Sequence, residues 1–497
     1  MDGTADTSLT RTSPDTWHRG LMSSAIVVGS GPNGLAAAAR LARAGLDVTV
    51  LEASDVIGGG TRSSEMIVPG LVHDHCSAIH PIAAASPFFD ELDLTAEGRL
   101  TWLQPTIDCA HPLDDGSAGV MCRSIERTAE HLGRDGPRWR RVFEPMASHF
   151  DDLFADASQP ILRVPRHPLA LARFGAGAVL PATVVGRMWR TEQAKALWAG
   201  MAAHAFAPLD GPMTTAVGRM LIVAGHARGW VIAKGGSQAI ADALLDDIER
   251  HGGKIETNVR VTSVDDLPPT DVVMLDLSPS IAADILGDRL PTRVARSYRR
   301  FRHGPGAFKV DFAIDGDVPW TAPGAREAGT VHLGGSLGEV VANEEAVHRG
   351  VMPERPFVLV GQQYLADPSR SVGNVHPLWS YAHVPHGFAG DATEAIIAQI
   401  ERFAPGFRER IVGTAVRSTT EMALHNPNYI GGDIIGGAAS LKQLLFRPRF
   451  AADPYFTGIP GTYLCSASTP PGAGAHGMCG ANAAARALTR LGVRATA

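Results

Sequence analysis

Cysteine, lysine and long hydrophobic runs are all scarce in this sequence. Its 497 residues include 5 cysteines, which are widely spaced and form no Cys-x-x-Cys or Cys/His pattern. This argues against a disulfide scaffold, a thioredoxin-like redox pair and a structural zinc site, so we expect no metal centre. The most apolar stretch, residues 174–186, is short and contains Pro181, so the sequence predicts no transmembrane segment.

Charge of neither sign is in large excess. The 45 basic and 51 acidic residues give a net charge of −6. This excludes a strongly basic nucleic-acid-binding protein and gives no overall attraction to anionic membranes, although peripheral membrane contact and a homodimer stay open. The first 22 residues are polar and lack the apolar centre of a secretory signal. We therefore interpret residues 1–22 as a disordered leader and expect a cytoplasmic protein.

The first regular pattern is a β-α-β unit. Residues 25–29 form a short β-branched run that ends in glycine, which predicts a buried parallel strand. Residues 34–44 are strong helix formers followed by Gly45, and residues 47–52 predict a second strand. A connection of this length predicts a right-handed parallel unit.

Two later zones repeat this character. Residues 237–251 predict an amphipathic helix, and residues 254–264 and 272–277 predict strands. Near the end, residues 462–465 predict a strand and residues 480–491 a helix. In between, residues 76–230 read as mainly helical, whereas residues 300–450 mix strands with helix.

A glycine motif joins the first strand to the first helix. Gly29-Ser-Gly31-Pro-Asn-Gly34 fits G-x-G-x-x-G: Gly29 for the tight turn, Gly31 for approach to a pyrophosphate and Gly34 for helix–strand packing. The helix N-terminus offers free amides to phosphate. Glu52 ends the next strand, where its carboxylate binds ribose hydroxyls and disfavours NADP. The alternative is a tight turn without nucleotide.

Two further glycine segments distinguish FAD from NAD. Gly58-Gly59-Gly60-Thr61-Arg62 extends the phosphate site, and an NAD domain does not need it. Residues 466–482 form a glycine-rich stretch, including Ser468, that leads directly into a helix. Such a helix N-terminus faces the pyrimidine side of a flavin and stabilises its reduced, anionic form. The alternatives are a glycine loop with a surface arginine and a glycine-rich packing turn.

Together these segments resemble a family. The chain is similar to the phytoene dehydrogenase-related, pyridine nucleotide-disulfide oxidoreductase domain-containing FAD proteins of the amine oxidase–phytoene desaturase superfamily. The resemblance rests on residues 27–34, 52–62, 74–81, 85–89, 234–239, 304–311, 426–433 and 463–484. It implies that FAD is lined by Ser30, Gly31, Pro32, Asn33, Glu52, Ala53, Gly59, Gly60, Thr61, Arg62, Val261, Gly477, Met478 and Asn482.

The resemblance also implies a fold. We expect an α/β protein in which a Rossmann-like FAD-binding domain of the glutathione-reductase type carries an inserted, mixed α+β substrate-binding domain. The predicted FAD-binding domain is discontinuous and comprises residues 23–75, 228–292 and 455–497. The predicted substrate-binding domain comprises residues 76–227 and 293–454.

Two departures from related flavoproteins bear on the cofactors. We find neither a redox cysteine pair nor a second nucleotide motif, which argues against a dedicated NAD(P)H site. Monoamine oxidases attach flavin to a C-terminal cysteine. Cys465 and Cys479 instead fall in the predicted strand and cradle, so we expect non-covalent FAD.

Candidate catalytic residues are fewer. Lys309, one of five lysines, lies in a predicted strand of the substrate domain, and in amine oxidase-like folds a lysine holds water near flavin N5. His80 and His476 lie beside expected flavin-facing segments and could act as base or orient substrate. The alternatives are a half-exposed strand lysine and packed or capping histidines. His204 reads as a core histidine, and residues 426–437 as a loop over the cofactor or a structural turn.

These observations predict a FAD-dependent oxidoreductase, either a dehydrogenase/desaturase or an oxidase. A small hydrophobic or amphipathic substrate would give hydride to flavin N5, with O₂, a quinone or another compound as electron acceptor. Two alternatives stay open: a redox-neutral flavin-dependent isomerase, and a flavin-binding interaction protein.

Overall fold

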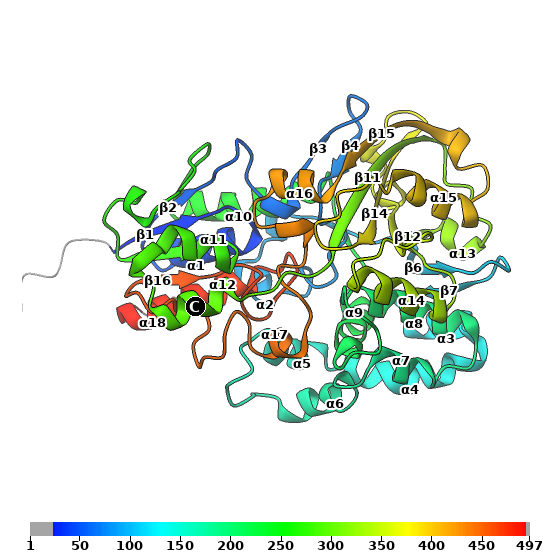
Figure 1. Cartoon of the computed structure of the whole chain (residues 1–497), viewed down its shortest axis with the longest axis horizontal. Coiled ribbons are helices and arrows are strands. Elements are labelled where there is room, and N and C mark those ends of the chain that lie inside the picture. The colour runs from blue at the N-terminus through cyan, green and yellow to red at the C-terminus, as the bar shows by residue number, and fades with distance from the viewer. Residues whose placement is uncertain (1–22, 494–497) are drawn as a thin grey trace, which may run out of the picture.

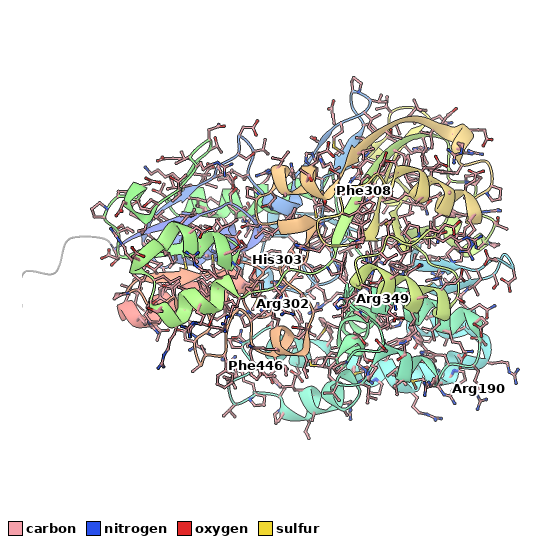
Figure 2. All side chains as sticks on the ribbon, in the orientation of Figure 1. Arg190, Arg302, His303, Phe308, Arg349 and Phe446 are labelled. Atoms are coloured by element: carbon pink, nitrogen blue, oxygen red, sulfur yellow. The ribbon has the colours of Figure 1, made fainter. Side chains whose placement is uncertain are left out.

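The computed structural model describes residues 23–493, so the predicted leader at residues 1–22 lies outside the described part of the chain. Two sheets form the centres of two lobes (Figure 1). The segment between α12 (Thr292–Arg299) and β11 (Gly306–Asp315) crosses from one lobe to the other, and Figure 2 shows its Arg302 and His303 between the lobes. The mixed α/β fold expected from the sequence is confirmed.

The first sheet is entirely parallel and draws its strands from three distant parts of the chain. Its order is β16 (Thr462–Leu464), β10 (Val272–Leu275), β1 (Ser24–Val28), β2 (Asp47–Leu51) and β9 (Lys254–Glu256). All five strands lie within the three segments assigned to the FAD-binding domain. The domain boundaries themselves stay a prediction.

Alternate residues of β1 enter two different cores, as expected for a strand buried on both faces. Ala25 and Val27 pack with α1 (Pro32–Arg43), α10 (Gln238–Arg250) and α18 (Met478–Leu491). Ile26 and Val28 pack with α11 (Pro279–Leu286) and α12. The crossing of α1 and α18 is close because Gly480 has no side chain, and a Cβ there would overlap the carbonyl oxygen of Asn33.

The second sheet is mixed, with β12 and β6 as its parallel pair. Its order is β15 (Ile411–Arg417), β11, β14 (Val375–Val384), β13 (Val358–Gly361), β12 (Ala328–Leu333), β6 (Ile107–Pro112) and β7 (Ala118–Met121). One face packs on a helical layer that includes α8 (Glu192–Ala203) and α14 (Leu337–His348), and the other on α15 (Thr393–Phe403).

The remaining elements surround these sheets. Two small ladders pair β3 (Ser63–Glu65) with β4 (Val72–Asp74) and β5 (Trp102–Leu103) with β8 (Ile232–Ala233). The other helices are α2 (Pro87–Leu92), α3 (Ile125–His131), α4 (Gly136–Ala147), α5 (Phe150–Ala157), α6 (Pro168–Ala178), α7 (Ala182–Gly186), α9 (Thr214–Arg228), α13 (Pro323–Arg326), α16 (Thr419–His425) and α17 (Leu441–Leu445).

Two sequence expectations need correction. The strand predicted over residues 254–264 ends at Glu256, because Asn258 adopts a left-handed conformation (φ 60°). Its amide then donates to the carbonyl of Ser54, which turns the chain over the edge of the sheet. The mainly helical region 76–230 also contains β6 and β7, which pair with each other, and β6 joins the second sheet through β12, which lies far away in sequence.

Candidate functional site

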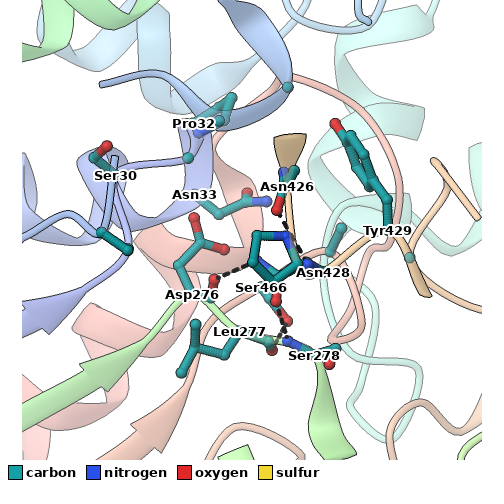
Figure 3. A pocket seen from close by; sticks show the side chains of 18 of the residues that line it. Ser30, Pro32, Asn33, Asp276, Leu277, Ser278, Asn426, Asn428, Tyr429 and Ser466 are labelled. Carbon is teal, nitrogen blue, oxygen red and sulfur yellow. Dashed lines mark hydrogen bonds between the residues drawn. The ribbon is translucent and has the colours of Figure 1, made fainter. Parts of the chain in front are cut away.

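A cavity of about 460 Å³ lies at the carboxyl ends of β1, β2 and β10 (Figure 3). This is where ligands bind in open α/β sheets. Parts of all three glycine segments line it. The sequence-predicted residues on its wall are Gly29, Ser30, Gly31, Pro32, Asn33, Glu52, Ala53, Gly59, Gly60, Thr61, Arg62, Val261 and Ser468.

The turn between β1 and α1 is built as the glycine spacing predicts. Gly29 has φ +97°, a conformation that favours glycine, and a Cβ on Gly34 would overlap the carbonyl oxygen of Gly29. Helix α1 begins at Pro32, two residues earlier than expected, and Gly31 precedes it without a side-chain cap. The amides at this helix end therefore face the cavity as an anion-binding group.

Glu52 lies at the end of β2, buried and held on both carboxylate oxygens. Its Oε2 accepts from the amide and the hydroxyl of Ser30 at 2.9 and 2.6 Å. Its Oε1 accepts from the amide of Ser54 at 2.8 Å and from Arg62 at 3.3 Å. These contacts fix an acidic group at the wall of the cavity, where the sequence predicts ribose recognition.

The second glycine segment lies directly against the first. The amide of Gly58 donates to the carbonyl of Ser30 at 2.9 Å, and a Cβ on Gly59 would lie 3.1 Å from the Cα of Gly31. A Cβ on Gly60 would overlap the hydroxyl of Tyr429. Only glycines allow these three chain segments to approach so closely, so the glycine run closes one side of the cavity.

The C-terminal segment supplies the other side. Ser466–Ser468 and residues 473–475 line the cavity, whereas Gly34, Gly477, Met478 and Asn482 are not part of its lining. Gly477 (φ +68°) starts α18, and Asn482 exchanges hydrogen bonds with the carbonyl of Ser158 at 2.9 Å and with Gln159 at 2.8 Å. The predicted flavin contacts of Gly477, Met478 and Asn482, and the assignment of Gly34 to the cofactor site, stay predictions.

Sequence reasoning missed Asp276 at the end of β10. Its Oδ2 accepts from the amide of Gly34 at 3.0 Å, and a Cβ on Gly31 would overlap the same oxygen. Burial is the main reason that the pKa of Asp276 is raised to about 7; the amides of Gly34 and Gly31 oppose this shift, and the charge of Glu52 adds to it. The available signal was a polar residue at the carboxyl end of a central parallel strand.

The loop at residues 426–437 lies against the cavity. The sequence offered two interpretations of it, a loop over the cofactor and a structural turn. Asn426, Asn428 and Tyr429 line the cavity. Asn428 attaches this loop to the sheet, because its Oδ1 accepts from the amide of Ser278 at 2.8 Å and its Nδ2 donates to the carbonyl of Asp276 at 3.3 Å. The sequence indicated this loop as one of two interpretations but named none of these side chains as site residues, since nothing in their local sequence indicates the long-range contact.

Lys309 lies on β11 near the same cavity but outside its lining. It is buried (2% exposed), paired with Asp311, and its Nζ lies 5.6 Å from the ring centre of Trp379. Burial lowers the pKa of Lys309, while Asp311 opposes that shift and Cys76 of the cavity wall acts in the same sense as Asp311. The expectation of a half-exposed strand lysine is wrong, and the catalytic role stays a prediction.

The two candidate histidines are buried and engaged. His80 Nε2 lies 2.8 Å from the hydroxyl of Ser237, and His476 Nδ1 accepts from the amide of Met478 at 3.0 Å. Burial lowers the pKa of each to about 4, so both are neutral near pH 7. Neither lines the cavity. Their catalytic roles stay predictions, and the contact of His476 is that of a helix cap.

His204 directly follows α8 and is partly buried, with its Nε2 3.0 Å from Nε2 of the buried His332. Within residues 23–493, no three or more His, Cys, Asp or Glu side chains are grouped so that they could hold a metal ion. Over the same range no helix has the length and apolar character needed to cross a bilayer. All five cysteines are buried and free.

Comparison with known proteins decides the family. The sequence pattern of flavin containing amine oxidoreductases matches residues 33–284, half of the chain. The chain belongs to this family. It is a FAD-dependent oxidoreductase.

Individual relatives agree. The chain is 25% identical to pyridine nucleotide-disulfide oxidoreductase domain-containing protein 2 of Rattus norvegicus, over 93% of this chain and 92% of that protein. It is 24% identical to a phytoene desaturase of Neurospora crassa, over 91% and 82%. Among solved structures, a putrescine oxidase variant has a TM-score of 0.59 at 17% identity, over 94% of this chain and 99% of that one, which shows a shared fold.

The cavity fits FAD on its own features. Asn33 Oδ1 and Arg62 Nε, both of cavity-lining residues, are buried without a hydrogen-bond partner. Buried polar groups in proteins are normally paired, so these atoms indicate a polar ligand. The N-terminus of α1, whose N-cap residue Gly31 has no side chain to occupy its amides, suits the diphosphate, and Glu52 suits the ribose.

Proposed function

We propose that this protein removes hydrogen from a small hydrophobic or amphipathic substrate as a dehydrogenase/desaturase or oxidase. The observation that carries the proposal is the convergence of the three glycine segments on one cavity that has Lys309 near its wall. When bound, FAD would supply the redox chemistry: it would take a hydride, which is two electrons and one proton, from a substrate C–H bond, while a second proton left to a base or to water, giving a C=C or C=N product and passing the electrons on to O₂, a quinone or another acceptor.

The protein's own side chains would position and enclose the reactants. Ser30, Glu52 and Arg62 would hold the cofactor without a covalent bond, since Cys465 and Cys479 are buried within the fold. The substrate would approach from the side of Lys309, where Trp379 and Tyr381 pack edge to face with ring centres 5.0 Å apart. An apolar, aromatic surrounding of this kind excludes water and accepts a hydrophobic substrate.

Lys309 would orient a water molecule or a substrate group beside the cofactor. A buried ammonium paired with a single carboxylate is costly to retain unless its charge or protons are used. Its pairing with Asp311 would favour its charged form. It also interacts electrostatically with Cys76, which lines the cavity, so Lys309 lies close to the cavity wall. Lys309→Met is therefore expected to slow the anaerobic reduction of bound flavin while FAD stays bound.

The test is anaerobic mixing of the holoenzyme with representative polyenes, monoterpenes and amines. Lasting loss of flavin colour with an unsaturated product supports the proposal. Turnover without loss of colour or need of an acceptor would instead indicate isomerisation, and no response to any substrate or reductant would indicate an interaction protein. The matched control is Lys254→Met, which removes an exposed lysine. In Lys309→Met the carboxylate of Asp311 would be buried without its partner and could destabilise the fold, so the double variant Lys309→Met/Asp311→Asn, which removes that charge, is measured as well.

A further inference from the structure

Exposed aliphatic side chains concentrate in one segment, residues 161–184, here named the apolar shoulder. It consists of a loop, α6 and the start of α7 at the lower edge of the molecule in Figure 1. Val164 and Leu169 are the most exposed, at 88% and 85%. The other exposed aliphatic side chains of the shoulder are Ile161, Leu162, Val179, Leu180 and Val184. Scattered surface leucines and valines are ordinary, but a group of this kind indicates an interaction surface.

The charged residues of this segment are all basic. Residues 157–191 contain no aspartate or glutamate and five arginines, although the whole chain has a net charge of −6. Arg166, Arg173 and Arg187 are exposed and form no ion pair with any residue in the range 23–493. On neighbouring α5, the acidic side chains are paired: Asp151 with Arg228, Asp152 with His167 and Asp156 with Arg163.

The shoulder is held in place. The carboxylate of Asp156 accepts from the amides of Arg166 and His167 at 3.0 and 2.6 Å, which fixes the loop before α6. Arg219 of α9 donates to the carbonyl of Phe174 at 2.7 Å and fixes the helix itself. Leu171 and Phe174 pack against the core of the lobe, whereas Leu169 and Arg173, one turn apart, face outward.

From this arrangement we propose that the apolar shoulder docks on the surface of a lipid bilayer with anionic headgroups. Aliphatic side chains that enter the interface, beside arginines that meet the headgroups, are the features of peripheral membrane binding. A second copy of the chain fits less well. In a twofold dimer through this face, the unpaired arginines of each copy would meet a segment that contains no aspartate or glutamate to pair with them. The apolar shoulder would therefore attract anionic lipid although the net charge of the whole chain is negative.

The shoulder also adjoins the C-terminal cradle. Ser158 and Gln159, just before it, both bond to Asn482 of α18. Docking would therefore place the bilayer beside the helix that begins at the predicted flavin contacts. Membrane binding does not depend on the substrate proposed above, so either proposal can fail alone.

The experiment is co-sedimentation of the holoprotein with vesicles of phosphatidylcholine, with and without phosphatidylglycerol. We expect binding to the anionic vesicles that weakens with salt. Val164→Ser/Leu169→Ser, which removes apolar side chains from the interface, and Arg166→Gln/Arg173→Gln, which removes two charges from the anionic surface, should each weaken the affinity for anionic vesicles about tenfold or more. Matched controls are the exposed pairs Val351→Ser/Val412→Ser and Arg293→Gln/Arg300→Gln.

Retained FAD absorbance checks that each variant is folded. Hydrogen exchange of the wild-type holoprotein provides a second measurement, with protection by anionic vesicles expected within residues 161–184. Absence of binding to either vesicle, or binding that both shoulder variants leave unchanged, would overturn the proposal. So would concentration-dependent dimerisation that Val164→Ser/Leu169→Ser abolishes, because the face would then be a self-association surface.

Discussion

Replacing Asp276 by asparagine should remove a pH dependence from both stability and FAD binding. The carboxyl is 8% exposed, and burial raises its pKa from 3.8 to about 7. The folded protein therefore binds this proton more tightly than the unfolded chain. The stabilising contribution is complete below pH 3.8 and is lost as the pH rises through about 7. A shift of about three pKa units corresponds to about 4 kcal/mol of unfolding free energy.

The affinity for FAD should depend on pH through the ionisation of the same carboxyl group. At the N-terminus of α1, which suits the diphosphate of FAD, Asp276 already accepts from the amide of Gly34. An ionised carboxylate there opposes a second anion. The Kd of the wild-type apoprotein for FAD should rise about tenfold from pH 6 to pH 8, as expected when one proton with a pKa near 7 must be bound. Asp276→Asn should keep the hydrogen bond from Gly34 and lose the slope.

Quenching of FAD fluorescence gives the Kd at each pH, and urea unfolding of the apoprotein gives the free energy. The control is Asp284→Asn, an exposed acid on α11. If Asp276→Asn and the wild type show the same slope of Kd with pH, the reasoning is refuted. The linkage to stability is refuted separately if the unfolding free energy changes between pH 6 and pH 8 by the same amount in Asp276→Asn as in the wild type.

Two further predictions concern the cofactor site. Glu52→Ala should raise the Kd for FAD about tenfold or more, because charge-assisted hydrogen bonds are worth about 1.5–3 kcal/mol each; equal flavin content after purification would contradict the ribose assignment. Gly31→Ala should lose FAD because its methyl group overlaps Asp276, whereas Gly338→Ala, where a Cβ meets nothing closer than 3.8 Å, should retain it. Dialysis followed by absorbance measures both, and equal retention in the two glycine variants would exclude the steric argument.

The glycine turn and Glu52 could be predicted because their function depends on local spacing. A strand, a tight turn and a helix occupy fewer than thirty consecutive residues, and the chemistry of each glycine follows from that turn. Asp276, Asn428 and Tyr429 could not be found in this way, since only folding brings their segments to the first glycine turn.

The second sheet shows the same limit. Strands β6 and β7 are short and lie within a helical region, and β6 is fixed in the sheet by pairing with β12, more than two hundred residues later. The strand predicted over residues 254–264 failed for a local reason instead. Its alternating apolar residues continue past Asn258, but the left-handed turn at that residue redirects them into the loop above the sheet.

The parallel sheet also has a consequence for synthesis of the protein. Its edge strand β16 (Thr462–Leu464) is made about 190 residues after β10, the strand with which it pairs. On the ribosome, β1, β2 and β10 therefore emerge long before this neighbour exists. The growing chain would expose the unpaired edge of β10 until β16 emerges, which makes this lobe dependent on protection of that edge during synthesis.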